Sequence, residues 1–377
     1  MNSKYKFAPD PQTGFLSDEA TKKYFSRLGF AVCALIFSRV FVASAFYNVC
    51  LVFFNSIPYL LEKISALLPS LLPAGAIPYW TAVLTSSNAK EIAESIVVLI
   101  SIFAVGLPVF SAISKPLPNI TPVKNKMGFK GWIGGLCIAV LFLYFGNSIS
   151  SYLVYAIESL LNITLVNPVG ESVNNSNMLT TIIFTVIIIP IFEEILFRKI
   201  ICDKLLPLGE GYAVLVSAVI FGLIHGNFYQ FPYAFLLGAL FAFIYVKTGN
   251  LIYSIFYHMI INFIGTVAST WIFNLMNSID MGLLEQIVQS QTIDMNDPAT
   301  MYIVKISYIV IAYSALLMVI YISGLVLLFR ARKKNLVRLD AGLLPPPKKH
   351  RFGNIFLTSG VAATIAMFVL TFILSLM

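Results

Sequence analysis

Three short polar motifs lie in a chain that is otherwise dominated by apolar runs. A carboxylate and an imidazole can together hold a water molecule and remove its proton, and Glu193 with His225 suits this work. An imidazole and an amide N–H can donate hydrogen bonds to an oxyanion, and His258 with Asn262 suits that part. Hydrolysis of a peptide bond requires both activities. The motifs are, in chain order, Glu193-Glu194 with Arg198, Phe221 with His225, and His258 with Asn262.

The spacing within the first motif separates its two carboxylates. Glu194 and Arg198 are four residues apart, so on a helix they share one face in the better orientation for an acid–base pair. Successive helical residues are rotated by about 100°, so Glu193 points elsewhere and can serve a different partner. We therefore predict that Glu193 is the general base, directed at His225, and that Arg198 neutralises Glu194. Two alternatives stay open: Arg198 binds a substrate carboxylate, or the pair is purely structural.

The same residue types make zinc the main competing chemistry. Glu193, His225 and His258 would supply a His₂Glu ligand set of the kind that catalytic zinc sites use. The chain has three histidines and no HExxH motif, the helical pair typical of zinc peptidases. We therefore expect no cofactor, with zinc at these three residues as the alternative. The remaining histidine, His350, lies in a basic loop and is expected to be a solvated side chain.

Composition defines the environment in which these motifs must work. Hydrophobic residues make up 58% of the 377 positions and charged residues 11%, with a mean hydropathy of +0.86. A soluble domain carries roughly 25% charged residues. The apolar residues come in runs as long as a transmembrane helix needs, which predicts an all-α, polytopic transmembrane helical bundle of about 8–9 spans. A carboxylate near the bilayer centre costs roughly 2.5–3.5 kcal/mol, so two in a row indicate a functional site.

The apolar runs and the basic residues together predict a topology. With a cytoplasmic N-terminus, all but four of the 25 Lys and Arg residues fall on the predicted inner side, the exceptions being Arg39, Lys63, Lys90 and Lys305. The net charge of +8 therefore belongs to cytoplasmic loops, and we expect no nucleic-acid partner. The expected partners are the lipid bilayer and a peptide or protein substrate. The nine predicted spans are residues 28–51, 92–113, 132–153, 178–201, 212–226, 229–246, 251–276, 301–329 and 354–376.

This pattern divides the chain into a polar cytoplasmic tail, N-terminal spans, a catalytic core and C-terminal spans. Prolines are expected to break the chain after the first span, and the stretch 277–300 is expected to be a polar loop. Arg39 lies inside the first span, and the sequence leaves its partner open. The breaking prolines are Pro58, Pro69, Pro73 and Pro78. The four parts are residues 1–27, 28–177, 178–276 and 277–377, the last with a basic cytoplasmic loop at 330–351.

Depth in the membrane is the critical test of the predicted site. At 1.5 Å per helical residue, Glu193 lies roughly 16 Å, His258 roughly 12 Å and His225 roughly 20 Å from the predicted inner helix ends. These depths allow the three side chains to share one layer in the inner half of the membrane, with His225 as the outlier. If His225 were more than a helix diameter, about 10 Å, from Glu193, the mechanism would fail.

At the three motifs the sequence resembles the CPBP family of membrane proteases, also called the Abi or type II CAAX prenyl endopeptidase family. The family pattern is EExxxR on one span, FxxxH on the next and HxxxN on a later one, and this chain matches all three over about residues 178–265. The resemblance implies an intramembrane, glutamate-dependent endopeptidase. The roles it implies are general base for Glu193, water binding for His225, an oxyanion hole for His258 and Asn262, and site ordering or binding of a substrate terminus for Glu194 and Arg198.

The resemblance leaves the substrate open. Eukaryotic members trim prenylated CAAX proteins, whereas many bacterial members are linked to bacteriocin processing or self-immunity. The Phe- and Ile-rich, Lys-bearing composition leans towards a low-GC bacterium. We therefore expect a multi-pass protein of the bacterial cell membrane with a site accessible from the cytoplasmic side. The alternatives are a non-catalytic immunity or scaffold protein of the same fold, a proton-relaying transporter, and a zinc-dependent version of the protease, since the family was long described as metalloproteases.

Overall fold

The fold is built from helices alone. The computed structural model describes residues 7–167, 177–290, 293–347, 355 and 358–374. Within these ranges no strand forms, and the one β-bridge joins Gly209 to Ala341. The all-α prediction is therefore confirmed for the described part of the chain. His350 and the first residues of the ninth predicted span lie outside the described residues.

In the described part of the chain, seven helical segments are long and apolar enough to cross a membrane, and two further apolar helices are shorter. Each of the nine predicted spans overlaps one of these nine segments. The number of crossings and the side of the N-terminus stay predictions. The long segments are Asp18–Leu67, Ser87–Ser114, Phe129–Leu161, Met178–Leu208, Phe231–Thr248, Leu251–Asn277 and Pro298–Lys333, and the shorter helices are Glu210–Leu223 and Ser359–Leu374.

The first segment is longer than the sequence predicted. It runs as α1 (Asp18–Phe37), the π-helical η1 (Ser38–Val42) and α2 (Ala43–Leu67), with Pro58 inside α2. The prediction that Pro58 breaks the chain is wrong, because neighbouring groups can compensate the one backbone hydrogen bond that a proline removes. A helical segment of 50 residues is about 75 Å long, more than twice the roughly 30 Å of a bilayer core.

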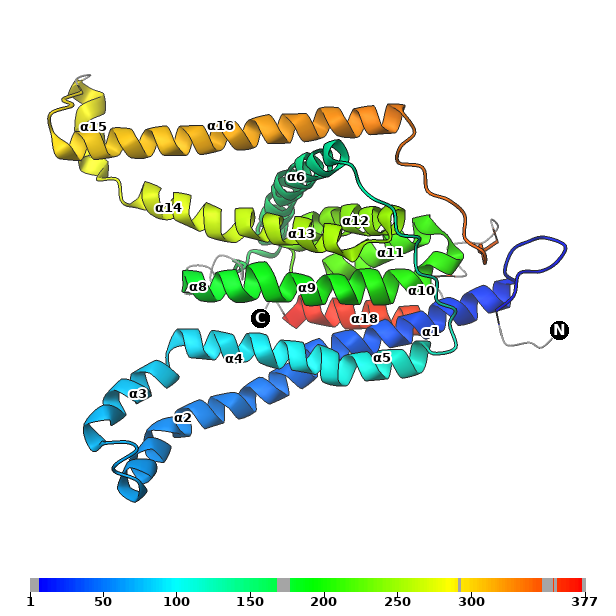
Figure 1. Cartoon of the computed structure of the whole chain (residues 1–377), viewed down its shortest axis with the longest axis horizontal. Helices are drawn as coiled ribbons and strands as arrows, with labels where there is room; N and C mark the ends of the chain where they lie inside the picture. Colours follow the sequence, from blue (N-terminus) through cyan, green and yellow to red (C-terminus); the bar gives the residue numbers. More distant parts are fainter. Residues whose placement is uncertain (1–6, 168–176, 291–292, 348–354, 356–357, 375–377) are drawn as a thin grey trace.

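Two arms therefore extend from the central helices (Figure 1). The lower arm contains α2, α3 (Ile77–Leu84) and the start of α4 (Ser87–Ile100). The upper arm contains α14 (Ser269–Asn277), α15 (Met281–Ser290) and one end of α16 (Pro298–Lys333). The helix α15 lies within the stretch 277–300 that was predicted to be a polar loop, so that prediction is wrong for residues 281–290.

The central helices pack closely where glycine removes a side chain. A Cβ on Gly238 of α12 (Phe231–Thr248) would lie 2.9 Å from the Phe221 ring of α11 (Glu210–Leu223), so glycine is needed at this crossing. The C-terminal α18 (Ser359–Leu374) packs on α1 in the same way, with Thr364 donating a hydrogen bond to the Gly29 carbonyl at 2.7 Å. Such close contacts hold the polar side chains between helices in defined positions.

The helical segment that carries the two glutamates is irregular. We call the whole segment Met178–Leu208 the glutamate helix. It contains α8 (Met178–Thr181), the π-helical η4 (Ile182–Ile188), α9 (Ile189–Glu194) and the π-helical η5 (Ile195–Cys202), and it ends in short turns. A further π-helical segment, η7 (Phe263–Ala268), follows α13 (Leu251–Asn262). The wide turns of π-helices are frequent at functional sites, because they redirect side chains within a helix.

Candidate active site

Glu194 belongs to a closed ion-pair cluster. The Arg198 Nε donates to Glu194 Oε2 at 2.8 Å, and both side chains are fully buried. Arg198 Nη1 donates to Ser217 Oγ at 2.8 Å, and the Ser217 hydroxyl donates to the Phe197 carbonyl at 3.2 Å. The guanidinium also lies 5.0 Å from the centre of the Phe221 ring. A buried ion pair is tolerated only when its hydrogen bonds are satisfied, and these contacts satisfy them.

The burial of Arg198 bears on its two predicted roles. Its guanidinium is bonded to Glu194 and Ser217 and has no exposed surface. A substrate carboxylate could reach it only after the surrounding helices separated. The geometry therefore favours an ordering role for the pair over binding of a substrate terminus.

His258 lies between the two carboxylates. Its Nδ1 is 3.1 Å from Glu194 Oε1, and its Nε2 is 3.7 Å from Glu193 Oε2. The His258 ring comes from α13 and is 5% exposed. The sequence analysis directed Glu193 at His225 and did not predict that one imidazole would face both glutamates. The glutamate side chains differ in access, since 27% of Glu193 is exposed and none of Glu194.

The position of the proton on His258 follows from its neighbours. An ionised carboxylate only accepts hydrogen bonds, so Nδ1 must carry a proton to bond Glu194. The Nε2 atom can then donate to an oxyanion only if the ring is doubly protonated. At 3.7 Å, the gap between Nε2 and Glu193 is too long for a direct hydrogen bond. A small molecule that is hydrogen-bonded to both His258 Nε2 and Glu193 would fit this gap better than a direct contact between them.

His225 lies just beyond the end of α11, in the turn that leads to α12. Its Nδ1 is 2.8 Å from the Phe221 carbonyl, so Nδ1 carries the proton and Nε2 is left as an acceptor. The Phe221 ring contacts the His225 ring at 5.2 Å and the His258 ring at 5.6 Å, edge to face in both cases. No hydrogen bond joins the His225 and Glu193 side chains, although the two groups lie near each other.

The turn that holds His225 has its own local anchors. Gly226 has a φ of +70°, which a residue with a side chain rarely adopts. The Asn227 amide donates to the His225 carbonyl at 3.0 Å, and its side-chain oxygen accepts from the Gln230 N–H at 2.9 Å. The residues Gly226 and Asn227 therefore reverse the chain and fix the backbone at His225.

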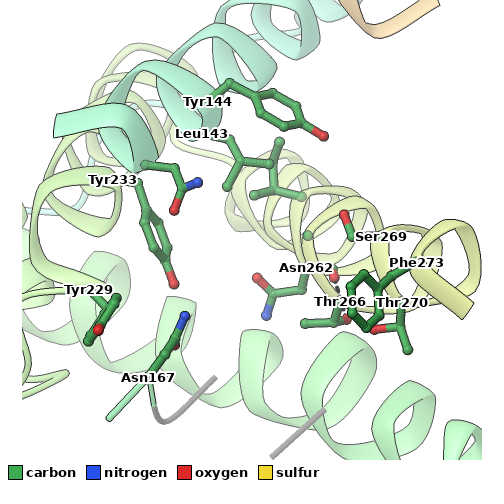
Figure 2. Close-up of a pocket in the computed structure, with 13 residues that line it drawn as sticks. Leu143, Tyr144, Asn167, Tyr229, Tyr233, Asn262, Thr266, Ser269, Thr270 and Phe273 are labelled. Carbon is green, nitrogen blue, oxygen red and sulfur yellow. Dashed lines mark hydrogen bonds between the residues drawn. The ribbon is translucent and has the colours of Figure 1, made fainter. Parts of the chain in front are cut away.

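Asn262 spans two helices and borders a pocket. Its Nδ2 donates to the Thr185 carbonyl of η4 at 2.8 Å, which uses one of the two amide protons. Figure 2 shows Asn262 on one side of a pocket of about 400 Å³ and Tyr233 on the other. None of the lining residues is Asp, Glu, Lys, Arg or His, and nine of them carry a hydroxyl or an amide. The pocket therefore offers uncharged hydrogen-bonding groups next to a residue assigned to the oxyanion hole.

Arg39 also reaches the site, from the N-terminal part of the chain. Its Nη1 donates to the Ile224 carbonyl at 2.6 Å, one residue before His225, and Glu193 and Glu94 lie near it. The sequence analysis left this residue without a partner. The available signal was a single arginine inside an apolar span, which by itself indicates a functional position.

Metal binding was tested against the geometry. Among the described residues, no group of three or more His, Cys, Asp or Glu side chains could hold a metal ion. Glu193, His225 and His258, the alternative zinc ligands, do not form such a group as they stand. We therefore derive no step through a metal, and metal dependence stays a matter for experiment.

Comparison with known proteins places the site in a family context. Residues 175–264 match the family described as type II CAAX prenyl endopeptidase Rce1-like. YdiL of Bacillus subtilis (strain 168), whose name describes a candidate membrane peptidase, is 39% identical over 82 residues, which are 22% of this chain and 34% of that protein. The membrane-embedded CAAX protease MroQ of Staphylococcus aureus (strain USA300) is 38% identical over 88 residues, 22% of this chain and 36% of that protein.

The similarity is confined to the part of the chain that holds the site. The chain spans about a third of the length of the curated relatives it matches. No solved structure matches it at a comparable level of significance. The glutamates, Arg198, both intramembrane histidines and Asn262 all fall within the matched residues. Residues 175–264 of this chain are therefore similar to the Rce1-like type II CAAX prenyl endopeptidases.

Proposed function

We propose that this chain is an intramembrane endopeptidase that hydrolyses peptide bonds of membrane-associated or lipidated substrates, with Glu193 as the general base. The observation that carries the proposal is the contrast between the adjacent carboxylates. Glu194 is buried and paired, whereas Glu193 is partly exposed beside His258. An accessible carboxylate among imidazoles, inside a segment related to peptidases, is suited to activating water.

The reaction uses water as the nucleophile. Glu193 takes a proton from the water while the water oxygen bonds to the peptide carbonyl carbon. The carbonyl π electrons move to its oxygen. The oxyanion is stabilised by the remaining Asn262 amide proton and by Nε2 of a doubly protonated His258. When the C–N bond breaks, the proton on Glu193 passes to the leaving nitrogen. His225 accepts a hydrogen bond from the water through Nε2, the nitrogen left free by the Phe221 carbonyl.

The pocket beside Asn262 is suited to an uncharged part of the substrate. Its hydroxyl and amide groups can bind an extended peptide backbone, and it has no counter-ion for a charged side chain. An unpaired charge placed in such a pocket loses its hydration without compensation. The proposed substrate therefore carries uncharged residues next to the cleaved bond.

The route of entry is open to a direct test. The charge pattern predicts a site accessible from the cytoplasm. The pocket, however, is lined by the later parts of α6 (Phe129–Leu161) and of Leu251–Asn277, away from the predicted inner helix ends. A Thr270→Cys variant without the native cysteines, treated with an impermeant maleimide from each side, separates these routes. Labelling from the cytoplasmic side alone supports the charge-based prediction, and labelling from the other side alone contradicts it.

Cleavage by the purified full chain tests the proposed function. The probe is a quenched fluorescent peptide library with uncharged central residues, with and without a prenylated cysteine, presented in lipid nanodiscs. We expect the wild type and Glu285→Gln, an exposed control carboxylate, to cleave, and Glu193→Gln and His225→Gln to lose activity. Equal cleavage by all four proteins would remove the assigned roles. If no protein cleaves and Glu193→Gln preserves the cellular phenotype, the immunity or scaffold alternative replaces the protease.

Metal dependence is measured on the same preparation. Activity that survives thorough chelation, with no zinc by elemental analysis, refutes the zinc alternative. Activity that falls on chelation and returns with added zinc would instead require a metal site that the present arrangement does not form.

A further inference from the structure

The turn that carries His225 lies within the helical bundle. The preceding helix, α11, has 14 residues and is about 21 Å long, too short to cross a bilayer core of about 30 Å. The last carbonyls of any α-helix lack partners within the helix. In a membrane such groups must be satisfied by other parts of the protein, because water is absent. The end of α11 therefore needs a hydrogen-bond donor from elsewhere.

Arg39 supplies this donor. Its guanidinium bonds the Ile224 carbonyl at 2.6 Å, and Ile224 is only 6% exposed. A hydrogen bond from a charged donor is shorter and stronger than a neutral one. A cation at a helix C-terminus is also stabilised by the helix dipole. Because His225 follows Ile224 directly, the contact fixes the backbone from which the imidazole projects.

Arg39 also lies near the proposed general base. The titratable groups near Glu193 come from several elements: His225 after α11, Tyr233 of α12, His258 of α13 and the neighbouring Glu194. Arg198 is committed to Glu194. Arg39 is a further cation near Glu193, and Glu94 is also near it.

A second hydrogen bond ties the turn to a residue outside the matched segment, from the Tyr229 hydroxyl to the Leu165 carbonyl at 2.9 Å. The contacts from α18 are apolar. The C-terminal α18 places the Thr371 methyl group against Gly226, where a Cβ would lie 2.5 Å from it. Phe372 of α18 packs edge to face on Phe228 at 4.6 Å. These α18 contacts are van der Waals packing, whereas the Ile224 carbonyl accepts its hydrogen bond from Arg39. Of these contacts from α1, η1 and α18 to the turn, the hydrogen bond is the one from Arg39.

We propose that Arg39 is a positioning residue of the active site, which holds the His225 turn through the Ile224 carbonyl. Its catalytic consequence rests on the proposed function. The arginine lies outside residues 175–264, so the N-terminal helices contribute to the site as well as the related segment.

Histidine NMR tests the positioning directly. The chain has three histidines, so protein labelled with ¹⁵N-histidine gives three sets of ring signals, each assigned by a His→Gln variant. In Arg39→Gln and Arg39→Met we expect the His225 signals to shift or broaden, because its fixed tautomer is loosened. His350 signals should not move, and Arg39→Lys should resemble the wild type. Unchanged His225 signals in the Gln and Met variants would overturn the proposal.

Kinetics on the same proteins measures the consequence. A misplacement of about 1 Å costs on the order of 10²-fold in rate, so Arg39→Met should lower kcat by about that factor with little change in KM. Arg39→Lys should restore most of kcat. Lys204→Gln is the matched control, because Lys204 also donates to a backbone carbonyl, that of Leu117, at 3.0 Å. A loss of kcat in Lys204→Gln equal to that in Arg39→Met would mean that Arg39 acts through general stability, against the proposal.

The two readouts separate two failures. If the wild type cleaves no peptide but the Arg39 variants alter the His225 signals, the positioning proposal stands and the proposed function fails. If the wild type cleaves and neither kcat nor the His225 signals respond to Arg39, the function stands and the positioning proposal fails.

Discussion

The glutamate helix carries two glutamates in opposite environments: Glu194 is buried and paired, and Glu193 is partly exposed. We call Glu194, Arg198 and Ser217 the closed cluster, and Glu193, His225 and Asn262 the open cluster. In the closed cluster the ion pair is fully buried and its guanidinium is bonded on two sides. In the open cluster Glu193 is partly exposed, and its side chain has no hydrogen-bond partner among the described residues. His258 lies between them and touches both.

This difference indicates how a membrane protein can hold a reactive charge. A carboxylate whose oxygens already accept hydrogen bonds is stable but is not free to take a proton from water, so Glu194 is suited to a structural role. A carboxylate that is left incomplete can bind water and accept its proton, so Glu193 is suited to catalysis. The closed cluster supports the open one through His258, whose Nδ1 bonds Glu194 and whose Nε2 faces Glu193.

The largest expected effect is the loss of activity in Glu193→Gln. General acid–base catalysis contributes about 10²–10⁴-fold, and kcat should fall by that factor. The melting temperature should stay close to that of the wild type, because the Glu193 side chain makes no hydrogen bond to a described residue that the amide would break. Peptide cleavage and thermal unfolding in detergent measure the two effects. A Glu193→Gln variant that stays active, or that unfolds, would contradict the assignment of Glu193 to catalysis and of Glu194 to structural support.

The next effect is the destabilisation of the closed cluster by Arg198→Met. Removing one partner of a buried ion pair costs about 3–5 kcal/mol, because the other charge is left uncompensated. We expect Glu194→Gln combined with Arg198→Met to recover much of the lost stability. Denaturant unfolding of the single and double variants measures the coupling. Additive losses would show that the pair is not an energetic unit.

A smaller loss is expected from Ser217→Ala. The buried Arg198 Nη1 would lose its acceptor, which costs about 1–3 kcal/mol. Unfolding measurements should detect this loss, while kcat should change little if the closed cluster acts only as support. A large fall in kcat at unchanged stability would mean that Ser217 takes part in the chemistry.

The smallest effect concerns the pocket of the open cluster. Gly265 lines the pocket, and a Cβ placed on it would meet no atom within 4 Å. Gly265→Leu should therefore fill the pocket without strain and raise KM about 10-fold, the size expected when roughly 1.4 kcal/mol of binding is lost. Gly265→Ala is the control and should bind substrate normally. If KM is the same in both variants, the substrate lies elsewhere.

Much of the fold followed from local properties of the chain. The apolar runs predicted the helical segments, because the length of a run decides whether it can span a bilayer. The i, i+4 spacing predicted the ion pair of Glu194 and Arg198, because both residues lie on one face of the same helix. Errors arose where a local signal was weak: Pro58 lies inside a helix, and residues 281–290 of a predicted loop are helical.

What only the tertiary structure decided is how the helices meet. The contact of His258 with both glutamates, the bond from Asn262 to Thr185 and the reach of Arg39 to Ile224 all join residues on different helical segments. The sequence by itself determined which polar residues enter the membrane and which share a helix face. Their partners across helices depend on the depth and rotation of each helix, which close packing at positions such as Gly238 sets.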